Sequence, residues 1–257
     1  SSTTLSPTSS TRSPPLVPYT TPALTTSEPA TTTCTLDGSP VGCADPIDEA
    51  NGSHNFAVTA TDAAGNSAAA NDIGLLDMTA PTLTVDAPAL TNDSTPTITG
   101  TTNLPAGSIV TLTITDALGA VQTVTATVVA GGTYSVDVPA ALAEGTFTAV
   151  ASASDAAGNS ASANDSGALD ITAPALTVDA PALTNDSTPT ITGTTNLPAG
   201  SIVTLTITDA LGTVQTVTAT VVAGGTYAVD VPAPLAEGTF TVVATASDAA
   251  GNAASAN

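Results

Sequence analysis

The stretch TNDSTPTITGTTNLPAGSIVTLTI, residues 91–114, occurs a second time without change at residues 184–207. It belongs to a longer duplication, in which 79–164 recurs as 172–257 with only seven substitutions among small residues. Self-similarity at a fixed period is typical of a repeated array. The period of 93 positions is too long for one solenoid unit and suits an independent β-sandwich domain.

The pentapeptide DAAGN sets the register of this array three times, at 62–66, 155–159 and 248–252. Its first occurrence shows that the less similar N-terminal part belongs to the same series. We therefore expect a Ser/Thr/Pro-rich linker or truncated end at 1–14, a shorter module at 15–78, a first full repeat at 79–171 and a second full repeat at 172–257.

Each full repeat shows the alternation of apolar and polar residues that predicts half-buried strands, separated by turns rich in Gly, Asn and Asp. We find no segment that combines helix capping with a 3.6-residue period. The pattern favours an all-β fold of tandem immunoglobulin-like β-sandwich modules with about seven strands in each full repeat. The seven strands expected in the first full repeat are 82–86, 95–101, 108–115, 120–129, 133–137, 146–154 and 160–169.

Two of these strands make specific predictions about burial. In SIVTLTIT, Ile109, Leu112 and Ile114 cannot share one face at a strict period of two, which predicts a bulge or burial of both faces. In the strand that begins near Phe147, every second residue up to Ala153 is apolar, so these side chains should form one inward face.

The charge balance excludes whole classes of partner. The chain has one Lys or Arg against 22 Asp and Glu, a net charge of -21. Nucleic acid binding needs cations that neutralise phosphates, and so does attraction to an anionic membrane surface. No apolar run is long enough for a membrane-spanning helix. We expect neither nucleic acid nor membrane insertion, and the absence of an initiator Met or leader pattern suggests an internal fragment of a longer protein.

Two cysteines, Cys34 and Cys43, lie in CTLDGSPVGC. Their spacing is too wide for a CxxC redox motif, and the chain offers no further Cys or His pair for zinc. A disulfide closing this loop would stabilise the fold by about 2–3 kcal/mol, and it would point to an oxidising compartment. Two reduced thiols are the alternative, and the sequence favours the disulfide.

Several motifs together resemble a known family. The duplicated stretch, GTFTAVASASDAAGN and LDITAP are similar to the tandem bacterial immunoglobulin-like repeats of giant surface adhesins and biofilm-associated proteins. The N-terminal part, with SEPATTTCTLDG and GSHNFAVTATDAAGN, resembles a related disulfide-bearing repeat. The resemblance covers nearly everything after residue 20. It implies extension units that are extracellular, on the bacterial cell surface, and often stiffened by calcium at their junctions.

The acidic residues suggest where such calcium would bind. If the strands run alternately up and down, the last hairpin turn returns to the end where its repeat begins, and so faces the incoming linker. Each junction would then gather carboxylate, amide and backbone oxygens, which calcium prefers. The predicted ligands are Asp77, Asn103, Asp155 and Asn159 at the first junction, and Asp170, Asn196, Asp248 and Asn252 at the second.

An alternative needs no metal. Asp-Ala-Ala-Gly-Asn is also a good turn sequence, in which Asp accepts backbone hydrogen bonds and Gly takes a positive φ. The large uncompensated negative charge favours calcium at the junctions. Asp93 and Asp186 are weaker candidates near the opposite end of each repeat.

The sequence lacks the combinations of residues that acid–base or nucleophilic catalysis needs. The single histidine, His54, aligns with Phe147 and begins the inward face of a strand, so a packing role is favoured over ligation. There is no Lys, and no nucleophile is paired with a base, so we expect no enzyme. The lack of Lys also excludes an intramolecular Lys–Asn isopeptide bond.

We therefore predict the extender region, or stalk, of an extracellular adhesin, whose partners are the neighbouring modules of the same chain. It would space a distal binding domain from the cell surface. The alternative is a structural subunit that self-associates laterally into a filament, sheath or layer. A carbohydrate-binding accessory is less favoured, because aromatic residues make up only 2% of the chain.

Overall fold

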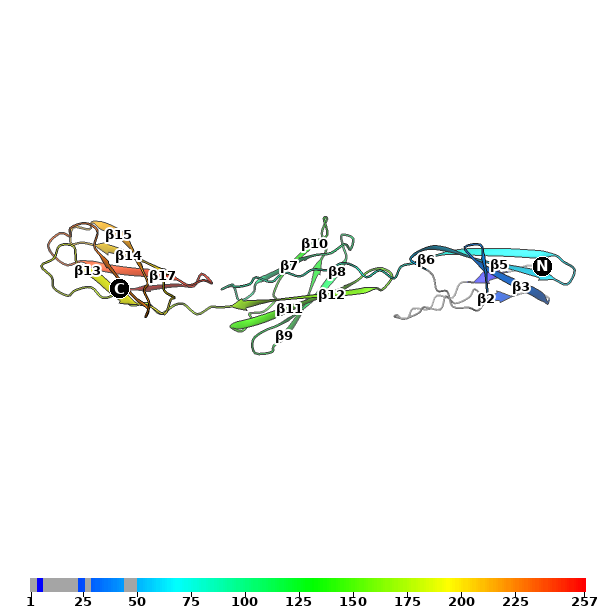
Figure 1. The fold of residues 1–257 in the computed structure, drawn as a ribbon, viewed down its shortest axis with the longest axis horizontal. Coiled ribbons are helices and arrows are strands. Elements are labelled where there is room, and N and C mark those ends of the chain that lie inside the picture. The colour runs from blue at the N-terminus through cyan, green and yellow to red at the C-terminus, as the bar shows by residue number, and fades with distance from the viewer. Residues whose placement is uncertain (1–3, 7–22, 26–28, 44–49) are drawn as a thin grey trace. The chain divides into compact units, whose positions relative to one another are not determined.

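The computed structural model describes residues 4–6, 23–25, 29–43 and 50–257. Apart from Thr4–Ser6, the expected linker at 1–14 lies outside these residues. In the described part every regular element is a β-strand, and no helix there is long and apolar enough to cross a membrane. The strands are labelled along the chain in Figure 1. The chain divides into two compact units, 1–82 with 152–161 and 83–151 with 162–257.

The first unit contains a two-stranded pair, β1–β2, and a four-stranded antiparallel sheet in the order β4-β3-β5-β6. The β3–β4 hairpin turns through Asp37 and Gly38, whose φ angles of 49° and 81° suit the tight turn between paired strands. The buried core of this sheet is small and contains Cys34, Phe56 and Val58. The strands are β1 (Thr4–Ser6), β2 (Ala23–Thr25), β3 (Ala30–Leu36), β4 (Ser39–Val41), β5 (Gly52–Asp62) and β6 (Ser67–Leu76).

The strands of the first full repeat form two sheets, β10-β7 and β12-β11-β8-β9. This is the two-layer arrangement of a β-sandwich, in which the inward residues of both sheets form one core. The strands are β7 (Thr97–Thr101), β8 (Ile109–Thr115), β9 (Val121–Thr127), β10 (Thr133–Asp137), β11 (Gly145–Ser154) and β12 (Ser160–Leu169).

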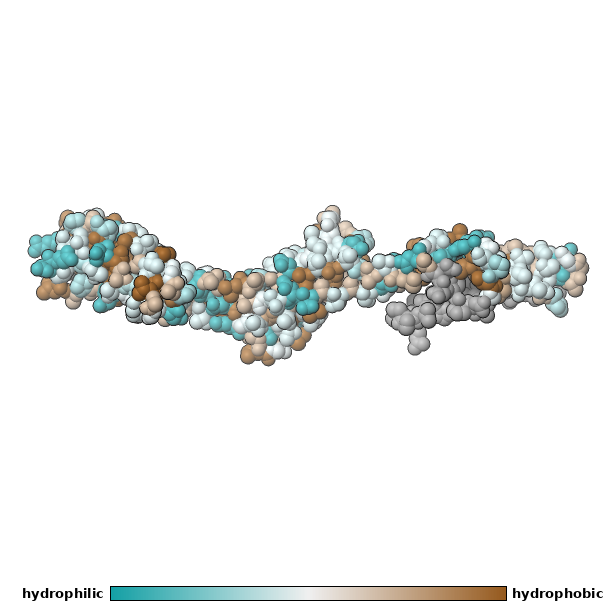
Figure 2. All heavy atoms as spheres, viewed as in Figure 1, coloured by the Kyte–Doolittle hydropathy of each residue, from teal (hydrophilic) through white to brown (hydrophobic). Residues whose placement is uncertain are grey.

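The second full repeat has the same plan, with sheets β13-β16 and β15-β14-β17-β18. Its core cluster includes Ile191, Leu205 and Tyr227. Figure 2 shows a mostly pale surface with separate brown and teal patches, as expected for a chain rich in Thr, Ser and Ala. The strands are β13 (Thr190–Thr194), β14 (Ile202–Thr208), β15 (Val214–Thr220), β16 (Thr226–Asp230), β17 (Thr241–Ser247) and β18 (Ala253–Ala256).

Strand β8 corrects one prediction. Val110, Leu112 and Ile114 are fully buried, whereas Ile109 is 52% exposed. The pairing with β9 runs without a break from Ile109 opposite Thr127, so the strand has no bulge. The adjacent Ile and Val allowed either residue to start the inward face, and the strand uses Val110. By contrast, the inward face predicted for β11 is confirmed, because Phe147, Ala149, Ala151 and Ala153 are all buried.

The expected strand at 82–86 is not a regular strand. It makes two isolated bridges, Leu83 opposite Thr102 just after β7 and Asp86 opposite Thr99 on β7. The chain then leaves β7 and forms a parallel bridge between Thr91 and Leu169 on β12. Pro88 lies between the two contacts, and proline has no N–H to continue a ladder. The segment therefore takes the place of a seventh strand while it moves from one sheet to the other.

A tyrosine fastens this segment to the sandwich. The hydroxyl of Tyr134, on β10, donates a hydrogen bond to the carbonyl of Thr84. Burial of this phenol raises the pKa of Tyr134 to about 12. A side chain at Gly100, which pairs with Tyr134, would collide with both the hydroxyl and the Thr84 carbonyl. The tyrosine can reach its partner only because position 100 is glycine.

Candidate junction sites

The DAAGN turn is closed by its own side chains. In the first full repeat, Asp155 Oδ1 accepts a hydrogen bond from the Asn159 backbone N–H at 2.9 Å, and Oδ2 accepts one from Asn159 Nδ2 at 2.9 Å. Gly158 has a φ of 94°, which favours glycine. The Asn159 side chain is the largest cause that holds the pKa of Asp155 below its ordinary value. The hydrogen bonds expected of a turn that needs no metal are therefore present.

The same asparagine also reaches the linker, within the first unit. Asn159 Nδ2 donates to the main-chain carbonyl of Asp77 at 2.9 Å. The structure thus brings together the linker and the turn. The Asp77 carboxylate, however, is exposed and accepts the Thr79 N–H at 3.0 Å. The fourth predicted residue, Asn103, belongs to the second unit, where it is exposed after β7.

The second junction, within the second unit, repeats this contact. Asn252 Nδ2 donates to the Asp170 carbonyl at 2.8 Å and to Asp248 Oδ2 at 2.9 Å. Asn196 Oδ1 accepts the Ala175 N–H at 2.8 Å, just after the linker. Asp170, Asn196 and Asp248 line one groove. All four predicted residues of this junction therefore lie at the same end of the repeat.

The Asp248 carboxylate is partly buried in this groove. Its burial, the largest influence, raises the pKa, but hydrogen bonds from the Asn252 side chain and from turn backbone groups outweigh it. The pKa of Asp248 is therefore lowered, and the side chain is ionised at neutral pH. The Asp170 carboxylate accepts the Thr172 N–H at 3.1 Å. Two carboxylates thus flank the second linker.

A contact that the sequence analysis missed holds each linker from its other side. Glu144 accepts the Thr172 hydroxyl at 2.7 and 2.8 Å from its two oxygens. At the equivalent position, Asn51 Nδ2 donates to the Thr79 hydroxyl, and its Oδ1 accepts the Met78 N–H at 2.8 Å. Asn51 and Glu144 each stand directly before a glycine and 28 residues before the linker threonine. This shared spacing is the feature of the sequence from which both contacts could have been predicted.

The TNDS loops, which carry the weaker metal candidates, are likewise built as turns. Asp93 Oδ1 accepts the Thr95 N–H at 2.9 Å, and Asp186 Oδ1 accepts the Thr188 N–H at 2.9 Å. The neighbouring Asn92 side chain lies beside Gly251, at 3.5 Å from where a Cβ would stand. The loop at the far end of the first full repeat therefore borders the second junction.

The donor chemistry of the junctions suits a hard cation, since carboxylate, carbonyl and amide oxygens are the ligands calcium takes. Within the described ranges, however, no three His, Cys, Asp or Glu side chains come close enough to hold a metal ion. Main-chain and amide oxygens would have to complete a coordination shell. Calcium at Asp77, Asn103, Asp155, Asn159, Asp170, Asn196, Asp248 and Asn252 stays a prediction.

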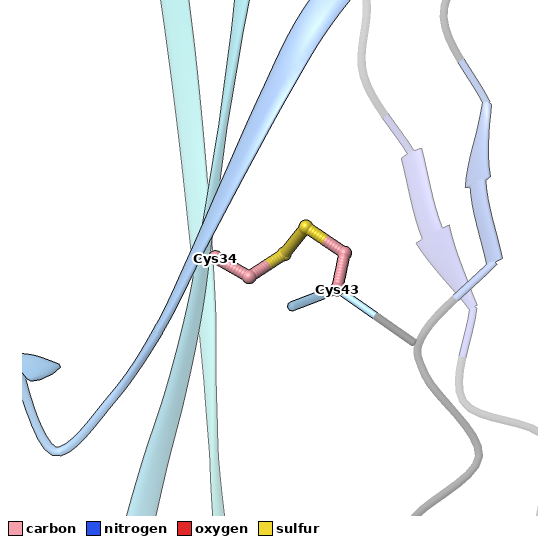
Figure 3. Close-up of a disulfide and its surroundings, with 2 residues drawn as sticks. All are labelled: Cys34 and Cys43. Atoms are coloured by element: carbon pink, nitrogen blue, oxygen red, sulfur yellow. A yellow bond between two sulfur atoms is a disulfide. The ribbon is translucent and has the colours of Figure 1, made fainter. Parts of the chain in front are cut away.

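The N-terminal module contains the predicted disulfide. Cys34, on β3, is bonded to Cys43, with their Cα atoms 5.2 Å apart (Figure 3). His54 is largely buried, with its Nδ1 at 2.7 Å from Asp37 Oδ2 and its Nε2 at 2.7 Å from the Ala50 carbonyl. This arrangement ties the tip of the β3–β4 hairpin to β5 and leaves the ring in a structural role.

This architecture of repeated β-sandwiches defines a class of immunoglobulin-like modules. The sequence model of the bacterial Ig-like domain matches residues 76–172 and 176–257, and the chain belongs to that family. A comparison with curated proteins finds no match.

Similar solved structures are repeats of bacterial adhesins. A tetra-tandem repeat from the extending region of a large adhesion protein is 35% identical, with 88% of this chain and 65% of that chain covered and a TM-score of 0.37. A 1.5-MDa bacterial ice-binding adhesin is 25% identical over 88% of this chain and 82% of its own, with a TM-score of 0.44. A calcium-stabilised, ice-binding adhesin of an Antarctic bacterium is 30% identical over 88% and 63%, with a TM-score of 0.40. The chain thus spans less than two thirds of the first of these structures.

Proposed function

We propose that this chain is a non-catalytic extender segment of a large bacterial adhesin. It spaces a distal binding domain from the cell surface, and calcium at the junctions between its modules stiffens it. The observation that carries this proposal is that each linker is hydrogen-bonded to both of the modules that it connects, which we call the double hold. At the second junction, Glu144 of the preceding repeat holds Thr172, while Asn252 of the following repeat holds the Asp170 carbonyl.

The double hold limits the rotation of a linker more than either contact alone. A linker that is bonded only to one neighbour can still pivot about its other end. Here the two bonded residues, Asp170 and Thr172, are separated only by Ile171. A bend at the linker must therefore break one of the two bonds, each of which contributes about 1 kcal/mol or more.

Charge explains why calcium would add to this hold. The net charge of -21 opposes compaction, and the junctions place carboxylates close to linker carbonyls. A divalent cation there would relieve this repulsion and link oxygens from both neighbours. The near-identity of the two full repeats also suits a spacer, because a module that recognises a particular ligand has no need to be copied beside itself.

The test is small-angle X-ray scattering of the whole chain, in calcium and then in EDTA. We expect chelation to broaden the distribution of interatomic distances, and Asn252→Ala to do the same in calcium. Asn66→Ala is the matched control, because Asn66 makes the same turn bonds to Asp62 and, among the described residues, holds no linker carbonyl. If neither EDTA nor Asn252→Ala changes the scattering, the stiff-spacer proposal is wrong.

Lateral self-association is the second candidate, and one feature favours it. Strands β9 and β15 are edge strands of their sheets and share the sequence VQTVTAT, which has no charge. Edge strands usually carry charges or proline that prevent pairing with another chain. Electron microscopy and sedimentation at increasing protein concentration would test this candidate. Filaments would support an assembling subunit. A protein that stays monomeric at all concentrations would contradict self-association and leave the spacer as the proposed function.

A further inference from the structure

The first segment of the first full repeat is bonded to its last strand. Ala168 N–H donates to the Ala89 carbonyl at 3.2 Å, and Thr91 N–H donates to the Ala168 carbonyl at 3.0 Å. Asp170 N–H then donates to the Thr91 carbonyl at 2.9 Å. The bridge between Thr91 and Leu169 is parallel. These are the residues through which the chain enters and leaves the repeat.

A side chain extends this ladder. Asp165 Oδ2, on β12, accepts the backbone N–H of Ala87 at 2.9 Å. Ala87 is 5% exposed, so without the carboxylate its N–H would lose its partner in a place with little water. A side chain at Gly167 would collide with the Pro88 carbonyl and the Phe147 ring, which shows that the segment lies directly against β12.

The direction of the two segments decides how they respond to tension. Residues 87–91 and the end of β12 run parallel. The first are connected through residues 83–86 to the incoming linker, and β12 is continuous with the outgoing one. A force on the two linkers therefore slides one segment along the other. The hydrogen bonds between the two segments lie across the direction of sliding, so the force loads all of them together. In a hairpin that is pulled apart from its open end, the hydrogen bonds break one at a time.

We propose that the contact between residues 87–91 and the end of β12, strengthened by Asp165, is the element that resists mechanical unfolding of the first full repeat. The biological use of this resistance rests on the proposed spacer function, since a spacer between a surface and a bound target carries tension. Asp165 acts here as a positioning residue that fixes Ala87 on β12.

The experiment is single-molecule pulling on the whole chain in EDTA, with handles attached through Met78→Cys and Ile171→Cys. Both side chains are about half-exposed, at 58% and 48%. Asp165→Ala is expected to unfold the repeat roughly 10-fold faster at the same force, because a hydrogen bond to a charged group contributes at least that factor. Asp165→Asn keeps an acceptor oxygen and should stay near the wild-type rate.

Two controls separate mechanical resistance from ordinary stability. Gln122→Ala removes two hydrogen bonds to Ala140 on the β9 edge, which is not continuous with either linker, so the rate under force should hardly change. One handle can be moved from position 78 to Leu118→Cys, at an exposed hairpin tip. The force then no longer acts through the first segment. In that geometry Asp165→Ala should have no effect.

The proposal is overturned if Asp165→Ala and Gln122→Ala act alike, or if Asp165→Ala acts equally in both pulling geometries. Because the measurement uses one repeat without calcium, its outcome is independent of the scattering test. A flexible junction would contradict the stiff spacer and leave this contact intact, whereas an unaffected Asp165→Ala would contradict the contact and leave the spacer intact.

Discussion

The substitution Gly100→Ala tests how the first segment is attached to the sandwich. A Cβ at position 100 would overlap both the carbonyl oxygen of Thr84 and the hydroxyl of Tyr134. The Thr84 carbonyl is backbone, and Tyr134 is 2% exposed, so neither group can move away easily. The φ of Gly100 is not positive, so backbone strain plays no part and the effect is purely steric.

The magnitude follows from three contributions. Overpacking of a well-filled site costs about 1–3 kcal/mol. Loss of the tyrosine hydrogen bond costs about 1 kcal/mol more. The lower entropy of the unfolded alanine chain offsets about 0.4–1 kcal/mol. The net loss in the free energy of unfolding is about 1–3.5 kcal/mol, which lowers Tm by about 5–25 °C for a domain of this size.

Differential scanning calorimetry of the whole chain would measure this loss, with the second full repeat and its intact Gly193 as the internal reference. Tyr134→Phe alone should cost about 1 kcal/mol, because it removes the hydroxyl without adding volume. In the double variant Gly100→Ala/Tyr134→Phe the loss should be smaller than the sum of the two, because each single variant already removes the same tyrosine hydrogen bond, although the collision with the ring carbon Cζ remains. Gly100→Ala at wild-type stability, or strict additivity, would refute the attachment described above.

Two further perturbations act on other parts of the chain. The pKa of Asp116 is lowered, chiefly by the Ala120 N–H, so its contribution to stability is present above its unfolded pKa of about 3.8 and is lost as pH falls below that value. Asp116→Asn should therefore flatten the acid limb of the stability profile, and an unchanged limb would contradict this. Reduction of the Cys34–Cys43 disulfide should destabilise the N-terminal module by about 2–3 kcal/mol and leave the full repeats unchanged, as calorimetry with and without reductant would show.

The sequence was sufficient to predict the fold wherever alternation was unambiguous. Strand β11 illustrates this, because Phe147, Ala149, Ala151 and Ala153 alternate along it and therefore share one face. In β8 the adjacent Ile109 and Val110 made the phase of the strand ambiguous, and the predicted bulge or burial of both faces was wrong. At 82–86 the β-branched residues predicted a strand, but the segment forms only isolated bridges. The partner changes from β7 to β12 within a few residues, and no local pattern contains that information.

The junctions show a similar limit. The direction of alternating strands was enough to place the Asp155–Asn159 turn beside the linker. It could not show that the contact would run through the Asp77 carbonyl, because a backbone oxygen has no letter in the sequence. The role of Asn51 and Glu144 was missed because the two residues differ in chemistry. Asn51 donates to the hydroxyl of Thr79, whereas Glu144 accepts from the hydroxyl of Thr172.

The asparagine of the DAAGN turn allows a prediction that separates the two interpretations of the junction. At present Asn252 Nδ2 donates to two oxygens, the Asp170 carbonyl and Asp248 Oδ2. A calcium ion shared by these oxygens would need the amide oxygen, not the nitrogen, to face them. Asn252→Asp keeps an oxygen ligand but removes the donor.

Without calcium, the new carboxylate would repel the two oxygens, and the junction should loosen as it does in Asn252→Ala. With calcium, the added charge should tighten the site and restore the wild-type scattering profile. Asn252→Ala should not recover, because it offers no ligand. If Asn252→Asp remains loose at millimolar calcium, the junction is held by the amide hydrogen bond alone, and the negative charge around it serves the solubility of the chain rather than a metal site.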